Sequence, residues 1–425
     1  MTNADAPLFF KVRQSFTRPR VEDLTEAVRR ELETVLPAAS LPKGVAIGVT
    51  VGSRGISGIA TIARAAVDFL KDRGARPFII PAMGSHGGAT ADAQRKLIAH
   101  YGVTEETMGC PVRAEMETRS LGRTDAGIDV RIAEAAWQSD GILLMNRIKP
   151  HTDYKGSIES GLTKICAIGL GKYDGAREIH RHLFTAGLGQ GIRSVAEKLV
   201  ATGKIVGGLG ILENAYHETA RIVGVPVAGL FEAEEQILEE ARGLMGRLPL
   251  DEIDVLVCDR LGKNISGAGL DTNVTGRSVY GYTAGVPWCD GMPRILRIAV
   301  MDVSDESDGN AVGMGQVDFV PERFAKRVDR EVTTLNAVTA CAPTGARMPV
   351  VLADDRQAIL TALRTSPIRA EGPLVVYVRD TLELEHVLLS EGCRSLVEDR
   401  DDLEIVSDPA PLRFDDRDRL QSPFA

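Results

Sequence analysis

Residues 146–182 read NRIKPHTDYKGSIESGLTKICAIGLGKYDGAREIHRH and are the most informative stretch of this chain. They follow a short apolar run at 141–145 (GILLM), whose length and turn-like borders favour a buried strand over a helix. The stretch holds three of the seven histidines, five glycines and, before residue 177, five lysines or arginines. Because open α/β sheets bind ligands at the carboxyl ends of their strands, this mixture predicts a functional loop.

The surrounding sequence alternates between two patterns, short apolar runs typical of buried strands and longer segments with helical spacing. The predicted strands lie at 44–51, 76–81, 141–145, 204–212, 253–258, 294–301 and 373–378. The predicted helices lie at 21–36, 59–71, 91–100, 192–201, 230–245, 321–338 and 355–364. This alternation predicts parallel βαβ units.

Residues 246–251 (GRLPLD) combine Gly and Pro just before a new strand and indicate a domain boundary. At 425 residues the chain is long enough for more than one domain. We therefore predict an α/β protein of two α/β domains with mainly parallel sheets and an active site in the interdomain cleft. Residues 1–247 would form the catalytic and cofactor-attachment domain, and residues 248–425 a second α/β domain that closes the cleft.

Composition restricts the class of partner and the compartment. A net charge of -9 and a pI near 5.5 argue against nucleic acid or an anionic membrane as a partner. The six cysteines form no CxxC pair, which argues against a disulfide framework or a zinc knuckle. No apolar run approaches the ~20 residues of a membrane span, so we expect a cytoplasmic protein. P-loop, GxSxG and HExxH motifs are absent from the sequence.

Three basic residues follow predicted strands in the first domain. Arg54 lies in a strand-to-helix turn, where the alternative is a solvated arginine. His86 lies among glycines that allow a ligand to approach closely, and His151 follows Pro150. An imidazole titrates near pH ~6.5, so two histidines can serve as acid and base at neutral pH. His86 and His151 are the candidate catalytic residues.

Lys164 and His180 are candidates for binding a cofactor and a metal. Lys164 lies in the apolar sequence SGLTKICAIG, which favours a covalent linkage over a solvated ammonium. The alternative is a helix lysine whose amine reaches solvent. His180 follows sixteen residues later and is a candidate metal ligand, with His182 as the other choice. In the second domain, the polar loop 259–277 offers an anion-binding set of Lys263, Asn264, Asn273 and Arg277.

This arrangement resembles the nickel-dependent lactate racemase family, whose members carry a nickel pincer nucleotide on a lysine. The matching motifs are Ser53-Arg54, Gly84-Ser85-His86, Pro150-His151, Lys164 with His180, and Asp271-Thr272-Asn273. The resemblance implies substrate-carboxylate binding by Arg54, acid/base catalysis by His86 and His151, cofactor attachment at Lys164 and nickel ligation by His180. It also implies that Lys263, Asn273 and Arg277 bind the cofactor.

Three departures from the family pattern indicate a divergent member. Val51 replaces an aspartate of the family, and three extra residues separate His151 from Lys164. The family's second-domain lysine and glutamine are also not matched in register, although Arg277 could substitute for the lysine. We therefore expect a racemase or epimerase of a 2-hydroxy acid other than lactate, which depends on cofactor-synthesis enzymes. The sequence leaves a homo-oligomer open.

Two other functions remain compatible with these residues. One is a non-catalytic α/β protein that binds a nucleotide-like anionic ligand, for which His86 would be dispensable. The other is a metal hydrolase that uses His151, His180 and Asp153.

Overall fold

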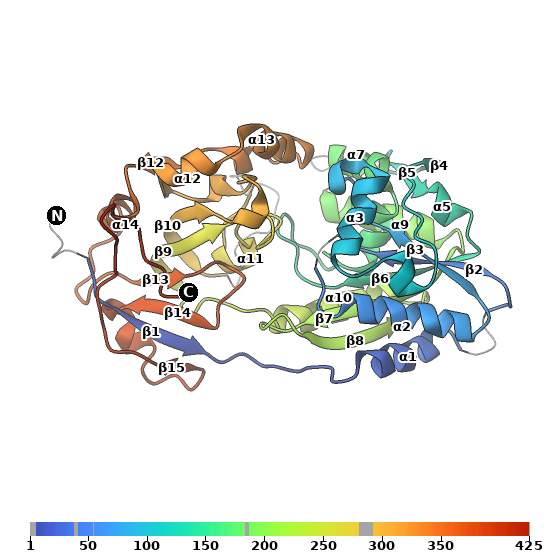
Figure 1. Cartoon of the computed structure of the whole chain (residues 1–425), viewed down its shortest axis with the longest axis horizontal. Coiled ribbons are helices and arrows are strands. Elements are labelled where there is room, and N and C mark those ends of the chain that lie inside the picture. The colour runs from blue at the N-terminus through green and yellow to red at the C-terminus, as the bar shows by residue number, and fades with distance from the viewer. Residues whose placement is uncertain (1–5, 38–40, 54, 183–186, 280–291, 425) are drawn as a thin grey trace. The chain divides into compact units, whose positions relative to one another are not determined.

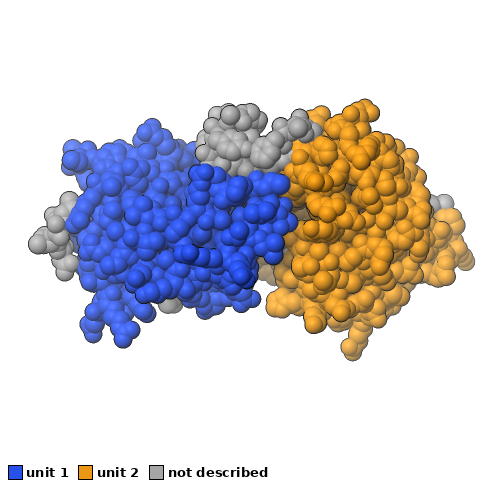
Figure 2. Space-filling view, turned by 90° about the horizontal axis from the view of Figure 1, so that it is seen from above, with its two compact units in different colours: residues 1–17, 246–425 blue, residues 18–245 orange. Residues whose placement is uncertain are grey.

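The computed structural model describes residues 6–37, 41–53, 55–182, 187–279 and 292–424. The chain forms two compact units, coloured separately in Figure 2. The N-terminal unit comprises Arg18–Met245, and the C-terminal unit combines Met1–Thr17 with Gly246–Ala425. Among the described residues, no helix is long and apolar enough to cross a membrane.

A five-stranded sheet is the centre of the N-terminal unit, in the order β3-β2-β6-β7-β8. Its strands are β2 (Ala46–Val51), β3 (Arg76–Pro81), β6 (Gly141–Arg147), β7 (Ile205–Glu213) and β8 (Thr219–Val225). All neighbouring pairs are parallel except β7 and β8. A separate antiparallel pair is formed by β4 (Thr118–Arg123) and β5 (Asp129–Ala133). The carboxyl ends of β2, β3 and β6 therefore lie along one edge of the sheet.

Helices cover both faces of this sheet (Figure 1). The first face packs on α1 (Leu24–Val35), α2 (Ile59–Asp72), α3 (Ala91–His100) and α4 (Glu105–Met108). The second packs on α5 (Glu134–Trp137), α6 (Leu162–Lys164), α7 (Lys172–Arg181), α9 (Leu188–Val200) and α10 (Leu230–Gly243). Side chains alternate between the two cores along each strand, as in β6, where Leu143 faces the first core and Leu144 the second.

The C-terminal unit is built on an eight-stranded sheet, in the order β12-β11-β10-β9-β13-β14-β1-β15. Its strands are β1 (Phe9–Gln14), β9 (Glu252–Leu261), β10 (Arg294–Val303), β11 (Phe319–Pro321), β12 (Val350–Leu352), β13 (Val375–Val378), β14 (His386–Ser390) and β15 (Leu403–Ile405). The five strands from β12 to β13 are parallel, and the remaining pairs are antiparallel. The predicted α/β class with mainly parallel sheets is thus confirmed.

The helices of this unit are α11 (Thr272–Thr275), α12 (Glu322–Arg327), α13 (Arg330–Thr339) and α14 (Asp355–Arg364). The sequence predicted one helix over 321–338, and this is wrong. The chain leaves helical geometry at Val328 and Asp329, and the Asp329 carboxylate accepts the Val332 N–H at 3.0 Å. An aspartate at this position starts a new helix because it binds an N–H group that has no partner within the helix.

The predicted division into domains needs one correction. The boundary between Met245 and Gly246 lies within two residues of the expected one, but the first seventeen residues belong to the C-terminal unit. Strand β1 pairs with β14 and β15 there. Phe10 and Val12 are fully buried in that unit's core, so this segment completes the second sheet instead of the first.

Candidate active site

The sheet of the N-terminal unit brings together three of the loops that carry predicted site residues. Strands β3, β2 and β6 are neighbours, and Val51 at the end of β2 lies opposite Pro81 at the end of β3. The loops that leave these strands carry Ser53, His86 and His151. Arg54, the predicted substrate ligand, lies outside the described residues.

The loop after β6 is held in shape by Glu159, whose side chain is completely buried. One carboxylate oxygen accepts the backbone N–H of His151 at 2.5 Å. The other accepts from the guanidinium of Arg242 at 2.7 Å. The hydroxyl of Tyr154 donates to the Glu159 carbonyl at 2.6 Å, and its ring lies 4.5 Å from the His151 ring. These contacts fix the backbone and the ring of His151.

Both nitrogens of the half-buried His151 ring have partners. The backbone N–H of Asp153 donates to Nδ1 at 2.9 Å, so a neutral ring carries its proton on Nε2. Nε2 lies 2.5 Å from Nζ of Lys164. A lysine nitrogen can accept a hydrogen bond only when it is uncharged, because the ammonium form has no lone pair. The geometry therefore suits an uncharged nitrogen at Lys164, the form that can act as a nucleophile.

Lys164 ends the short helix α6 and is followed by a π-helical turn at Ile165–Gly169. Its neighbours Thr163 and Ile165 are buried, while Lys164 itself is half-buried. The sequence predicted apolar surroundings for this lysine, whose amine contacts the His151 ring in the structure. Turns of the π type often mark functional sites because they interrupt the regular helix.

His180 lies in α7 and is oriented by its own helix. Its Nδ1 donates to the carbonyl of Ala176 at 2.6 Å, an arrangement that leaves Nε2 as the nitrogen with a lone pair. Burial lowers the pKa of His180, the hydrogen bond to Ala176 raises it, and Lys164 lowers it whenever its amine is protonated. His182, the other candidate ligand, lies just beyond α7, and its Nδ1 contacts the Glu178 carbonyl at 2.9 Å.

His151 is affected by the same charges. Burial lowers its pKa well below the usual value, and Lys164 and His180 contribute to the shift. The structure therefore brings three predicted residues, His151, Lys164 and His180, into one cluster. At neutral pH the depressed pKa keeps His151 uncharged, which is the form that accepts a proton.

His86 is exposed at the tip of the loop after β3. Its Nδ1 is hydrogen-bonded to the hydroxyl of Ser53. Gly84, two residues before it, has a positive φ of 60°, and a Cβ there would lie 3.1 Å from Ile168 and 3.3 Å from Ala176. Gly84 thus lets the His86 loop pack closely on the segment between Lys164 and His180.

Sequence analysis missed a buried polar network behind this loop. Lys172 is completely buried, and its Nζ donates to the Pro81 carbonyl at 2.9 Å and to Gln94 Oε1 at 3.1 Å. The Gln94 amide in turn donates to the carbonyls of Gly84 and His86, at 3.0 and 3.1 Å. Lys172 also has a left-handed backbone with φ of 52°, a strained conformation for a lysine. The network connects the His86 loop to the start of α7.

The pKa of Lys172 gives a testable pH dependence. Burial lowers it from 10.5 to about 8. Because the unfolded chain then binds the proton more tightly, Lys172 contributes full stability only above about pH 10.5 and loses that contribution as the pH falls through about 8. Relative to Lys172→Met, the parent should gain ~2 kcal/mol of unfolding free energy between about pH 7 and about pH 9.5. Urea unfolding at the two pH values measures this. If the unfolding free energy of the parent and of Lys172→Met rose equally between the two pH values, Lys172 would not be a buried amine that titrates in this range.

The residues predicted in the loop 259–277 lie in the C-terminal unit. Lys263 donates from Nζ to the Gly267 carbonyl at 2.5 Å, and Asn273 donates twice to Asp271 Oδ1. Arg277 pairs with Asp318 at 2.8 Å and donates to the carbonyls of Gln316 and Leu296. Arg277 thus holds its own loop to the sheet, and a cofactor-binding role for these three residues stays a prediction.

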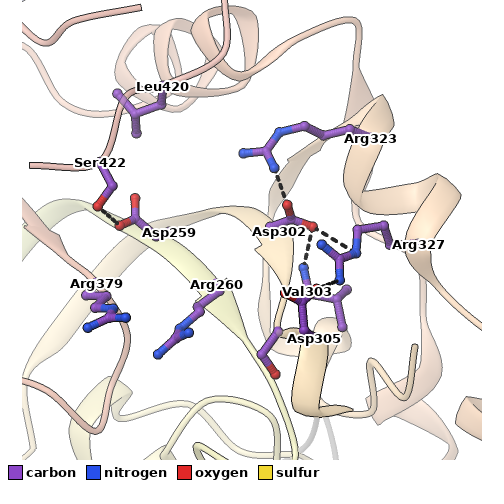
Figure 3. A pocket seen from close by; sticks show the side chains of 11 residues that line it. Asp259, Arg260, Asp302, Val303, Asp305, Arg323, Arg327, Arg379, Leu420 and Ser422 are labelled. Atoms are coloured by element: carbon purple, nitrogen blue, oxygen red, sulfur yellow. Dashed lines mark hydrogen bonds and ion pairs between the residues drawn. The ribbon is translucent and has the colours of Figure 1, made fainter. Parts of the chain in front are cut away.

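A pocket of about 300 Å³ also lies in the C-terminal unit, beside the ends of β9 and β10 (Figure 3). No residue predicted for the site lines it. Four arginines line it, and each is paired with a carboxylate of the same unit: Arg260 with Asp380, Arg323 with Asp355, Arg327 with Asp305, and Arg379 with Glu383. Because these charges are already balanced, we assign no anion site there.

Among the residues that the structure describes, no group of three or more His, Cys, Asp or Glu could hold a metal ion. A metal bound by protein side chains alone would require such a group. His180, whose Nε2 keeps a lone pair, and Lys164 are the residues here that could hold a metal carried by an organic group. That cofactor stays a prediction.

Residues 18–190 match the model described as the lactate racemase N-terminal domain. Over this region, the chain is similar to lactate racemases. The matched region contains four of the residues discussed above, His86, His151, Lys164 and His180, as well as Arg54.

A solved structure is similar to this chain over most of its length. The lactate racemase apoprotein from Thermoanaerobacterium thermosaccharolyticum has a TM-score of 0.52 to this chain, at 15% identity. The match covers 88% of this chain and 94% of that one. At this identity the similarity shows the fold alone. No curated protein sequence matches the chain.

Proposed function

We propose that this protein racemises or epimerises a 2-hydroxy acid with the help of a nickel pincer nucleotide linked to Lys164. The contact of 2.5 Å between Lys164 Nζ and His151 Nε2 is the observation that carries the proposal. It joins the attachment residue to a candidate base within one hydrogen bond. The similarity of residues 18–190 to the lactate racemase N-terminal domain supports the same reaction class.

Two residues of the chain would hold the cofactor. Lys164 would form the covalent linkage, and His180 would ligate nickel through Nε2 because its Nδ1 is bound to Ala176. The chemistry supplied by such a group is reversible hydride acceptance by a pyridinium ring whose electronics nickel tunes. Cofactor-synthesis enzymes would have to provide it.

The proton chemistry falls to His86 and His151. A 2-hydroxy acid must lose its hydroxyl proton when its carbinol carbon is oxidised and regain one when that carbon is reduced. Since the two enantiomers present this hydroxyl on opposite sides, two histidines on different loops can serve one enantiomer each. The depressed pKa of His151 keeps its imidazole uncharged for this role. Arg54 would pair with the substrate carboxylate through two parallel hydrogen bonds.

Turnover in deuterated water tests the proposed reaction class. Hydride transfer returns the substrate's own hydrogen to the carbinol carbon, whereas removal of that hydrogen as a proton exchanges it with solvent. For any 2-hydroxy acid that the protein racemises, we expect proton NMR to show full retention of hydrogen at that carbon in both enantiomers. Deuterium incorporation that keeps pace with racemisation would instead indicate a carbanion mechanism.

A further inference from the structure

Glu234 is a buried carboxylate next to the attachment lysine. It lies in α10 and is 1% exposed. Its Oε2 accepts the backbone N–H of Thr163 at 2.8 Å and the Thr163 hydroxyl at 2.5 Å. Thr163 directly precedes Lys164, and α6 has no side-chain cap from its own N-cap residue, Gly161. A residue seventy positions away in the chain thus binds the start of the helix that carries Lys164.

Burying this carboxylate costs folding free energy, which argues that Glu234 has a specific role. Its second oxygen, Oε1, is buried without a hydrogen-bond partner. Burial raises the pKa of Glu234 to about 7, although hydrogen bonds from Thr163 and from the backbone of Leu162 lower it. A Cβ at Gly161 would lie 1.9 Å from Oε1, so the glycine at this position leaves room for the carboxylate. A hydrophobic residue at 234 would avoid these costs.

We propose that Glu234 is a positioning residue, which holds Thr163 so that the Lys164 amine meets His151. The carboxylate accepts both hydrogen-bond donors of Thr163. It thereby ties the short helix α6 to helix α10 and fixes the backbone from which the Lys164 side chain extends. This inference rests on the proposed function in one respect only, namely that Lys164 is the residue to which the cofactor is attached.

The contact can be tested in protein that carries no cofactor. With ¹⁵N-labelled histidine, NMR resolves His151 Nε2, which is assigned by its loss in His151→Ala. Because Glu234→Ala removes the oxygen that accepts both donors of Thr163, the Nε2 resonance should move to the position that it has in Lys164→Met. Glu234→Gln keeps an acceptor oxygen and should leave the resonance near its parent position. Glu232→Ala, an exposed change in the same helix, is the matched control.

Hydrogen exchange separates this positioning role from general stability. The peptide that contains residues 162–169 should exchange about tenfold faster or more in Glu234→Ala, as expected for buried donors without acceptors. The Gln variant and the Glu232 control should stay near the parent. If Glu234→Ala fails to fold, Glu234→Asp, which is one methylene shorter, replaces it with the same expectations.

An unchanged His151 resonance in the Ala or Asp variant would overturn the proposal, even if exchange were faster. A displaced resonance in the Gln variant would also overturn the proposal, because an acceptor oxygen at position 234 would then not be sufficient to keep Lys164 in contact with His151. These readouts need no cofactor. Failure of the positioning proposal would therefore be seen in these measurements. Failure of the proposed function would be seen separately, as parent protein that never acquires an adduct on Lys164.

Discussion

Replacing His86 or His151 with alanine should reduce turnover ~100-fold or more in both stereochemical directions, the usual loss for a general acid or base. Each histidine would serve one enantiomer as base and the other as acid, so losing either interrupts both directions. His151 Nε2 lies one hydrogen bond from Lys164, and His86 lies on a loop that packs on the segment between Lys164 and His180. Initial rates with each enantiomer measure the effect.

The fold and the cofactor content should survive these replacements. His86 is exposed, and the loop around His151 is held by Glu159 through the backbone N–H, which alanine retains. His100→Ala, an exposed histidine at the end of α3, serves as a control and should keep the parent rate. If either single variant kept the parent rate in one direction, that histidine would have no part in catalysis in that direction.

Lys164→Arg should remove all activity, because arginine stays charged and cannot form the linkage to the cofactor. This is the largest effect we expect, since it removes the cofactor itself. Protein made together with the cofactor-synthesis enzymes should carry neither the adduct nor bound nickel. His180→Ala is the informative companion variant. It should keep the adduct on Lys164 while its nickel content, measured by elemental analysis, falls.

Local sequence patterns were sufficient to predict the strand ends and the cluster of His151, Lys164 and His180. A short apolar run followed by a polar, glycine-containing loop is encoded within a dozen residues, and parallel strands then place their carboxyl ends along one edge. The spacing between Lys164 and His180 is fixed by helices α6 and α7 with the π-helical turn between them.

The supporting residues depend on tertiary contacts and left no local signal. Glu159, Glu234 and Lys172 look like ordinary surface charges in the sequence, yet all three are buried. Strand β1 was missed for the same reason, since its partners β14 and β15 lie more than 370 residues away. Arg277 was predicted as a ligand from its residue type, whereas its guanidinium binds Asp318 and nearby carbonyls.

Peptide mass mapping of active protein tests the central claim most directly. The protein should be made together with the cofactor-synthesis enzymes, assayed for turnover of a 2-hydroxy acid, and then digested. The account predicts that the peptide containing Lys164 carries an added mass of several hundred daltons, and that this mass is absent from Lys164→Arg. An unmodified Lys164 in a preparation that turns over substrate would contradict the covalent attachment on which the proposed function rests.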